Sequence, residues 1–186
     1  ELERNLAQER LEYLLVSSPG VIYSCKAEED FAATYMSENV ESLTGYKAEQ
    51  FISGQNFWAS HLHPDDADRV FEDLHQVFET EYHNHEYRFL FADGRYHWVY
   101  DQLKLIRDEA GNPVEILGYW SDISDRKQAE TELQQAKDRL QAVLDAVPGL
   151  VSWMSYDVNE GRAYYLGVNQ HLADSYDLPT EAFVGH

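Results

Sequence analysis

The chain has 186 residues, with 34 acidic side chains against 14 lysines and arginines, and a formal net charge of −20. Such a surface repels phosphate groups, which argues against binding to nucleic acid or to an anionic membrane surface. Hydrophobic residues make up 44% of the sequence, which is enough for one or two folded domains. The single cysteine, Cys25, excludes an intrachain disulfide and a cysteine-rich zinc site, and it fits a reducing compartment.

No apolar run in the sequence is long enough to span a bilayer, and no signal-peptide pattern begins it. We therefore expect a cytoplasmic module without direct membrane contact. Because the chain starts in a charged segment and stops at Gly185-His186, we also expect a fragment of a longer protein, whose other parts could include membrane spans or catalytic domains.

The first third of the sequence predicts short elements. A helix over residues 1–16 is broken by Ser17-Ser18-Pro19-Gly20, and two strands over 21–26 and 31–36 follow. Residues 38–51 predict two short helices with Gly45 as the C-cap between them, since glycine adopts a left-handed backbone at little cost.

The middle of the sequence predicts helix and then sheet. A short helical turn begins at Phe57-Trp58, and Pro64 suits the first position of a longer helix. Alternating residues then predict strands over 85–91, 96–106 and 114–123, with a hairpin turn at Asp93-Gly94. Together the five strands predict an antiparallel sheet with helices inserted after the second strand, an α+β fold.

After Asp125 the pattern changes to a heptad repeat. Its apolar positions are Ala129, Leu133, Ala136, Leu140, Val143 and Val147. We interpret residues 125–147 as a helix that pairs in parallel with a second copy of the chain. The alternative is an amphipathic helix that lies on its own domain.

The sequence also contains an internal repeat. Pro148-Gly149-Leu150-Val151-Ser152-Trp153 echoes Pro19-Gly20-Val21-Ile22-Tyr23-Ser24, and residues 181–185 echo residues 49–54. A second copy of the fold would start near Pro148 and stop before its last three strands. The expected organisation is a linker helix (1–16), a complete domain (17–124), a signalling helix (125–147) and a truncated second domain (148–186).

The ordered set of motifs resembles a PAS domain with its C-terminal PAC segment, over about residues 11–127 and again from about 147. The motifs are Tyr35–Tyr46, His63-Pro64-Asp65-Asp66, Tyr87-Arg88-Phe89, Asp93-Gly94, Tyr96–Val99 and Gly118–Arg126. The resemblance implies a five-stranded antiparallel sheet with flanking helices and a ligand-sized pocket on one face. It also implies a non-catalytic sensory and dimerisation module, within a two-component sensor histidine kinase. The alternatives are a module of a cyclic-di-GMP cyclase or phosphodiesterase and a haem or metal sensor.

Family resemblance suggests that the corner from Asp122 to Arg126 joins the last strand to the signalling helix. Asp122 or Ser124 can cap that helix, and Arg126 can pair with Asp122. A change in the sheet would then alter the exit of the helix, although plain capping without switching is an equal alternative.

Several side chains are candidates for ligand binding. The predicted pocket-lining residues are Phe57, Trp58, Phe71, Phe89, Trp98 and Trp120, and the alternative is a filled core without a ligand. His75 lies on the helix that supplies the iron ligand in haem-binding relatives, and it is a weak candidate for that role. The pair His83 and His85 could form half of a metal site if His97 were adjacent, but no further ligand is evident and we predict no metal site. The cysteine-containing segment of LOV photosensors is absent, which argues against a flavin adduct.

The sequence lacks the common catalytic signatures. It has no phosphate-binding glycine loop, no His-Glu-x-x-His and no Gly-x-Ser-x-Gly. It also lacks a histidine-kinase phosphoacceptor box. We therefore expect no enzyme activity from this chain, and the identity of any ligand, the output domain and the direction of the signal stay open.

Overall fold

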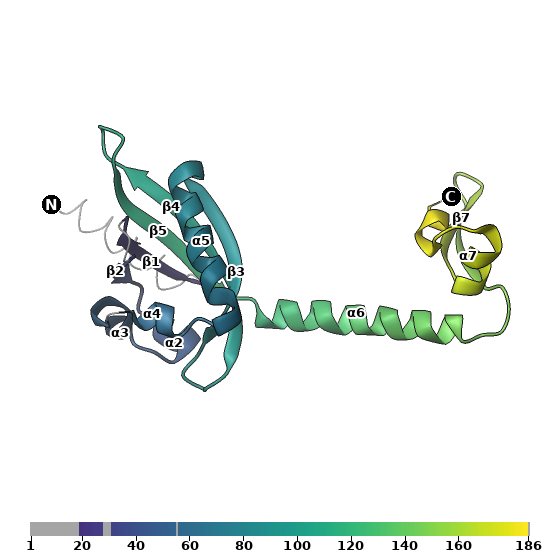
Figure 1. Cartoon of the computed structure of the whole chain (residues 1–186), viewed down its shortest axis with the longest axis horizontal. Coiled ribbons are helices and arrows are strands. Elements are labelled where there is room, and N and C mark those ends of the chain that lie inside the picture. The colour runs from purple at the N-terminus through teal and green to yellow at the C-terminus, as the bar shows by residue number, and fades with distance from the viewer. Residues whose placement is uncertain (1–18, 28–30, 55, 186) are drawn as a thin grey trace. The chain divides into compact units, whose positions relative to one another are not determined.

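A computed structural model describes residues 19–27, 31–54 and 56–185 of the chain (Figure 1). The chain divides into two compact units, Glu1–Lys127 and Gln128–His186. The helix predicted for residues 1–16 lies outside the described residues. Within the described ranges, no helix is both long and apolar enough to cross a membrane.

The first unit is built on a five-stranded antiparallel sheet with the order β2-β1-β5-β4-β3, which confirms the predicted sheet. The strands are β1 (Val21–Lys26), β2 (Ala33–Met36), β3 (Tyr82–Leu90), β4 (Tyr96–Arg107) and β5 (Pro113–Asp122). Strand β5 lies in the centre of the sheet, although it is the last of the five strands in the sequence of this unit. The strand that leads into the C-terminal helix is therefore in contact with both halves of the sheet.

Four helices separate β2 from β3, as the sequence predicted. They are α2 (Val40–Thr44), α3 (Ala48–Ser53), α4 (Phe57–Ser60) and α5 (Pro64–Thr80). Gly45 ends α2 with a φ of 78°, which is the left-handed C-cap expected of it. Pro64 occupies the first turn of α5, where its missing amide proton has no helical partner to lose. Helix α5 packs along β3 (Figure 1).

The core lies between the helices and one face of the sheet. On β3 and β4 the buried residues occur at every second position, as the pleat of a strand requires. Two clusters fill this layer. The larger cluster includes Val21, Val40, Phe51, Val70, Tyr87, Phe89, Val99 and Trp120, and the smaller includes Leu74, Val77, Leu103 and Ile116.

Helix α6 (Ser124–Asp145) begins in the first unit and continues into the second. None of its residues is buried, and its heptad residues Leu133 and Leu140 are each 58% exposed.

The second unit repeats the first elements of the fold. It contains β6 (Ser152–Asp157), β7 (Arg162–Val168), α7 (Gln170–Tyr176) and the 3-10 helix η1 (Thr180–Phe183). The Asn169 amide, at the N-cap of α7, donates to the Gly149 carbonyl (2.8 Å), just as Asn39, at the N-cap of α2, donates to Gly20 (2.9 Å).

Candidate functional site

A cavity of about 160 Å³ lies between the inner face of the sheet and helices α3, α4 and α5. Its walls are mainly aromatic and aliphatic. The lining side chains include Tyr23, Cys25, Met36, Phe51, Phe57, Trp58, Phe71, Leu74, Tyr87 and Trp120. An apolar cavity of this size matches a molecule of about the size of benzene, because engineered apolar cavities of about 150 Å³ take up benzene.

One carboxylate group lies beneath this cavity. Asp101 on β4 is 2% exposed and accepts hydrogen bonds from the hydroxyls of Tyr23 (2.9 and 3.0 Å) and Tyr87 (3.0 Å). The Trp58 indole N–H donates in turn to the Tyr87 hydroxyl (3.1 Å). Burial, and then the charge of Asp101, raise the pKa of Tyr23 and of Tyr87 well above the usual value, so both hydroxyls stay protonated.

This hydrogen-bond network fixes the orientation of three side chains in the cavity wall. Tyr23, Tyr87 and Trp58 all line the cavity and are all bonded, directly or through one hydroxyl, to Asp101. A ligand that moves any of these rings must change the hydrogen bonds of a buried carboxylate. The sequence alone did not identify Asp101 as part of this site, because an aspartate within a strand carries no signal of its partners.

Four of the six aromatic residues predicted to line the pocket do so, namely Phe57, Trp58, Phe71 and Trp120. Phe89 is fully buried in the core and does not reach the cavity. Trp98 does not line it either, because the buried residues Val99 and Asp101 define the inner face of β4 and Trp98 alternates with them. The presence of an aromatic residue in a strand did not show whether its side chain lies on the inner or the outer face of the sheet.

The candidate haem ligand, His75, does not meet the cavity. Its side chain is exposed, and its Nδ1 lies 2.7 Å from the Phe71 carbonyl oxygen. A porphyrin needs a far larger space than about 160 Å³. The residues present therefore do not fit haem.

The start of α5 is fixed by side chains of the His63–Asp66 motif. The His63 Nδ1, at the N-cap, accepts from the Asp65 amide (3.2 Å). Asp66 binds the guanidinium of Arg88 on β3 through both carboxylate oxygens (2.9 and 2.8 Å). The hydrogen bonds from Arg88 hold the pKa of Asp66 below its usual value. The His63–Asp66 motif and the Tyr87–Phe89 motif, each a weak signal alone, are thus joined by the contact between Asp66 and Arg88.

The corner between β5 and α6 is held by Asp122 and Ser124. The Asp122 Oδ1 accepts from the Ser124 amide (2.7 Å), and the Ser124 hydroxyl accepts from the Trp98 amide of β4 (3.0 Å). The Ile123 amide also donates to the Trp98 carbonyl (2.8 Å). These contacts fasten the first residue of α6 to the end of two neighbouring strands.

Arg126 lies elsewhere than the sequence suggested. Its guanidinium binds Glu86 on β3 (2.6 Å), and the Lys127 ammonium binds the other oxygen of Glu86 (2.6 Å). Asp122 is instead 3.2 Å from His97 Nδ1. The expected pair of Asp122 with Arg126 was wrong because the helix turns its third residue toward β3. Hydrogen bonds from Lys127 and Arg126 lower the pKa of Glu86, a residue that the sequence gave no reason to select.

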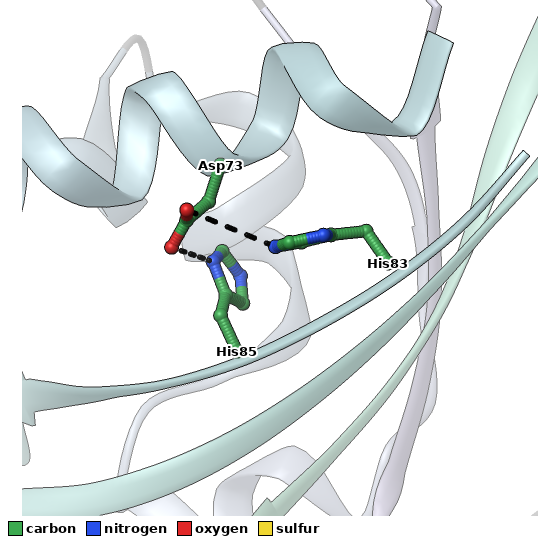
Figure 2. Close-up of side chains that lie close together, drawn as sticks. All are labelled: Asp73, His83 and His85. Atoms are coloured by element: carbon green, nitrogen blue, oxygen red, sulfur yellow. Dashed lines mark hydrogen bonds and ion pairs between the residues drawn. The ribbon is translucent and has the colours of Figure 1, made fainter. Parts of the chain in front are cut away.

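His97 does not complete a metal site with the other strand histidines. Its ring stacks on Phe91 (4.0 Å between ring centroids) and lies between Asp93 (3.1 Å) and Asp122 (3.2 Å). The partner of His83 and His85 is Asp73 of α5 (Figure 2). Burial, and then the neighbouring His85, lower the pKa of His83.

Comparison with known proteins identifies the family. Residues 33–120 match the family model described as the PAS fold. The two-component sensor PprA of Pseudomonas aeruginosa is 29% identical over 182 residues, which is 96% of this chain and 19% of PprA. The chain therefore spans about a fifth of the length of that relative.

Two solved structures have the same architecture. The N-terminal domain of a diguanylate cyclase with a PAS/PAC sensor, from Marinobacter aquaeolei, is 26% identical with a TM-score of 0.52 and covers 58% of this chain and 98% of that one. A sensory box histidine kinase/response regulator from Burkholderia thailandensis has a TM-score of 0.58 at 22% identity, over 72% of this chain and 98% of that one. Fold, motifs and family match agree, and residues 33–120 of the chain belong to the PAS fold family.

Proposed function

We propose that this chain is a non-catalytic sensory module that binds a small apolar molecule in its cavity and passes the resulting change to helix α6. The observation that carries this proposal is the attachment of the first turn of α6 to three strands. Ser124 bonds to β4, Asp122 ends β5, and Arg126 and Lys127 bind Glu86 of β3. A shift of these strands would therefore move the first turn of α6.

Two neighbouring residues of β3 connect the cavity to helix α6. Tyr87 lines the cavity and lies on β3 next to Glu86, and adjacent residues of a strand point to opposite faces. A ligand that displaces Tyr87 on the inner face would move the backbone that carries Glu86 on the outer face. The signal-transmission role that we give to Asp122, Ser124 and Arg126 therefore includes Glu86 as their anchor on the sheet.

We further propose that α6 associates with α6 of a second copy, since its heptad residues are exposed and apolar. We also propose that the parent protein is a two-component sensor histidine kinase and that this module is cytoplasmic, and the printed name of PprA, a two-component sensor, supports the first part. A diguanylate cyclase is the second candidate, because a domain of similar sequence and fold belongs to one.

The test of ligand binding is native mass spectrometry of the purified chain, which reports subunit number and bound mass together. We expect a dimer that carries a small molecule or takes one up from a library of benzene-sized compounds. The variant Ala59→Trp, which fills the cavity, should abolish the uptake. Uptake by that variant equal to the wild type would contradict the cavity as the binding site.

The test of transmission uses Glu86→Gln, with Glu72→Gln on the exposed face of α5 as the matched control. Loss of the two ion pairs should raise amide hydrogen exchange in residues 124–130 about tenfold, equivalent to about 1.4 kcal/mol of local opening. The Glu72 control should leave these amides unchanged. Equal protection in the wild type and in Glu86→Gln would remove Glu86 from the proposed route.

A further inference from the structure

Three side chains with metal-binding atoms converge between α5 and β3. Figure 2 shows Asp73 pointing down from the helix toward His83 and His85 on the strand. Asp73 Oδ1 lies 3.9 Å from His83 Nε2, and Asp73 Oδ2 lies 3.3 Å from His85 Nδ1. One donor atom from each of the three residues lies within 4.8 Å of the others.

The local fold explains this convergence. His83 and His85 are two residues apart on β3, so both project from the face of the sheet that α5 covers. Helix α5 runs directly into β3 through Glu81, whose φ of 63° reverses the chain, and this brings Asp73 back over the strand. The sequence placed the two histidines on one face but gave no reason to select Asp73, because that contact depends on how the helix packs on the sheet.

The histidines of this cluster are incompletely bonded. Among the residues that the structure describes, His83 Nε2 and His85 Nε2 are both buried and have no hydrogen-bond partner, and the side chain of His85 is 2% exposed. Native proteins pair nearly all buried polar atoms, so an unpaired nitrogen that faces a carboxylate indicates an absent partner. At His83 the unpaired Nε2 is the atom that faces Asp73.

The surroundings match the outer shell of a metal site. A histidine that binds a metal through one ring nitrogen usually directs the other toward a carboxylate, which sets its tautomer. His85 directs Nδ1 toward Asp73 and Nε2 toward Asp101, 3.7 Å away. Arg69 donates to Asp73 Oδ2 (3.0 Å), which leaves Oδ1 as the free ligand atom of that carboxylate.

We propose that Asp73, His83 and His85 bind a divalent transition metal ion, with Zn²⁺ as the preferred metal. Two imidazoles and one carboxylate favour Zn²⁺, Fe²⁺ or Ni²⁺ over Mg²⁺ and Ca²⁺, which prefer oxygen ligands. In a tetrahedral zinc site the ligand atoms lie about 3.4 Å apart. Asp73 Oδ1, the proposed ligand atom, lies 3.9 Å from His83 Nε2, which is about 0.5 Å longer than this spacing. The 3.3 Å contact of His85 Nδ1 is with the other oxygen, Oδ2, so small side-chain rotations would be needed to bring all three ligand atoms to tetrahedral spacing.

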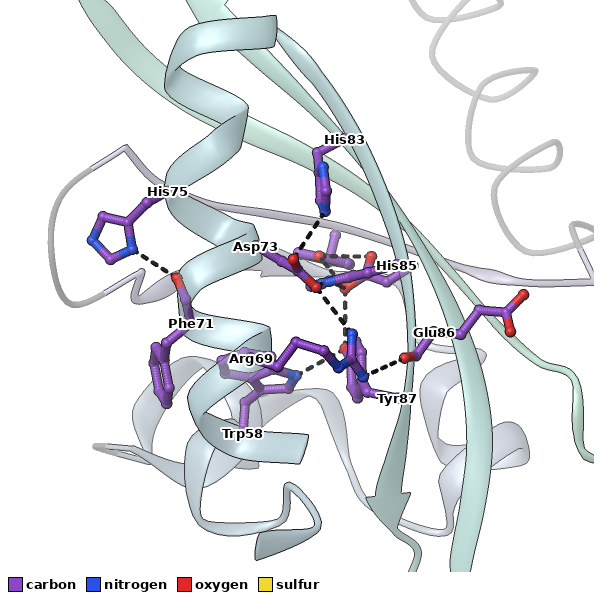
Figure 3. Close-up of polar contacts among 11 residues, drawn as sticks. Trp58, Arg69, Phe71, Asp73, His75, His83, His85, Glu86 and Tyr87 are labelled. Carbon is purple, nitrogen blue, oxygen red and sulfur yellow. Dashed lines mark hydrogen bonds and ion pairs between the residues drawn. The ribbon is translucent and has the colours of Figure 1, made fainter. Parts of the chain in front are cut away.

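A metal here would tie α5 to β3 beside the sensory cavity. Figure 3 shows that Asp73, His85 and Tyr87 belong to one group of polar contacts, and that Arg69 links Asp73 to the Glu86 carbonyl (2.8 Å). Three protein ligands also leave a fourth position open to water or to another ligand. The metal would thus stabilise the segment of β3 that carries Glu86.

The test is isothermal titration of the full chain with Zn²⁺ after removal of metals by a chelator. We expect one tight site per chain, and at least 100-fold weaker binding in His83→Ala and in Asp73→Asn. His75→Ala and His97→Ala are the matched controls and should bind as the wild type does. Far-ultraviolet circular dichroism establishes that each variant is folded, and His83→Gln replaces His83→Ala if the latter is not.

Replacement of Zn²⁺ by Co²⁺ provides an independent readout, because tetrahedral Co²⁺ gives visible absorption bands that are far more intense than the weak band of octahedral Co²⁺ in water. The bands should appear with the wild type and disappear with His83→Ala. Absence of a tight site in the wild type would overturn the proposal. So would an equal loss of affinity in His75→Ala, which would mark the binding as that of scattered surface side chains on a chain with a net charge of −20.

Discussion

Arg88 on β3 donates three hydrogen bonds to Asp66 at the start of α5. Its backbone N–H and Nε bind Oδ2 (2.9 Å each), and its second terminal nitrogen binds Oδ1 (2.8 Å). Asp66 is 7% exposed, so water screens this contact only in part. The contact sets the helix over the strand and thereby positions the cavity wall that α5 provides.

Replacement of Asp66 by asparagine should therefore destabilise the domain in a pH-dependent way. Arg88 lowers the folded-state pKa of Asp66, so the contact stabilises the fold above the unfolded-state pKa and is lost as the pH falls through the folded-state pKa. We expect a cost of about 1 to 2 kcal/mol at pH 7 that is lost at an acidic pH below the folded-state pKa of Asp66. Urea unfolding at both pH values measures it, with exposed Asp68→Asn as the control. An equal loss of unfolding free energy at both pH values would show that the substitution acts through packing and not through the charge of Asp66.

Replacement of Tyr87 by phenylalanine should remove one hydrogen bond to Asp101 and leave the Trp58 indole N–H without its acceptor. Because both groups are inside the fold, we expect the free energy of unfolding to fall by about 1 to 3 kcal/mol. Tyr35→Phe, at a side chain that is 43% exposed, should change it by less than about 0.5 kcal/mol. Equal effects of the two substitutions would show that the buried network contributes nothing specific.

Gly118 on β5 should not tolerate a side chain. A Cβ atom there would lie 2.0 Å from the ring of Tyr23, which is held in place by its hydrogen bonds to Asp101. We expect Gly118→Ala to destabilise the domain by about 1 to 3 kcal/mol. In the Tyr23→Ala background the same substitution should cost less, since the clashing ring is absent, and a double-mutant cycle of unfolding free energies measures the difference. A coupling energy near zero would contradict the proposed clash.

Replacement of both Leu133 and Leu140 by asparagine should separate the proposed dimer. These side chains occupy the heptad positions of α6 and are each 58% exposed in the single chain. Sedimentation equilibrium at high micromolar concentration should give a dimer for the wild type and a monomer for the double variant. Gln135→Asn with Asp138→Asn, at exposed positions on the face of the helix away from the heptad seam, should leave the dimer intact. A wild-type monomer would refute the pairing of α6.

The periodic features of this fold could be predicted from the sequence. Alternation fixed the strands and the buried face of β3, because a strand places every second side chain on the same side. Gly45 marked the end of α2 because a left-handed residue is required there. The same reasoning placed His83 and His85 together, whereas the corner at Asp122 and Ser124 was predicted from the family resemblance.

The pairs that carry the proposed function could not be predicted in this way. Glu86 meets Arg126 from 40 residues away, and Asp101 meets Tyr23 from 78 residues away. Alternation says which side of a strand a residue occupies, but not which residue of another element lies opposite. The position of Trp98 shows the same limit, since an aromatic ring suits either face and only the burial of Val99 decided between them.

The sequence by itself determined the order of the elements, the turns, the inner face of β3 and the repeat that begins near Pro148, because these depend on the local backbone and on side-chain spacing. Only the tertiary structure decided that Glu86 holds the start of α6, that Asp101 lies under the cavity and that Asp73 joins the two histidines. Those contacts depend on strand order and on the packing of α5 over the sheet, and both are set by the burial of the whole core rather than by any local pattern.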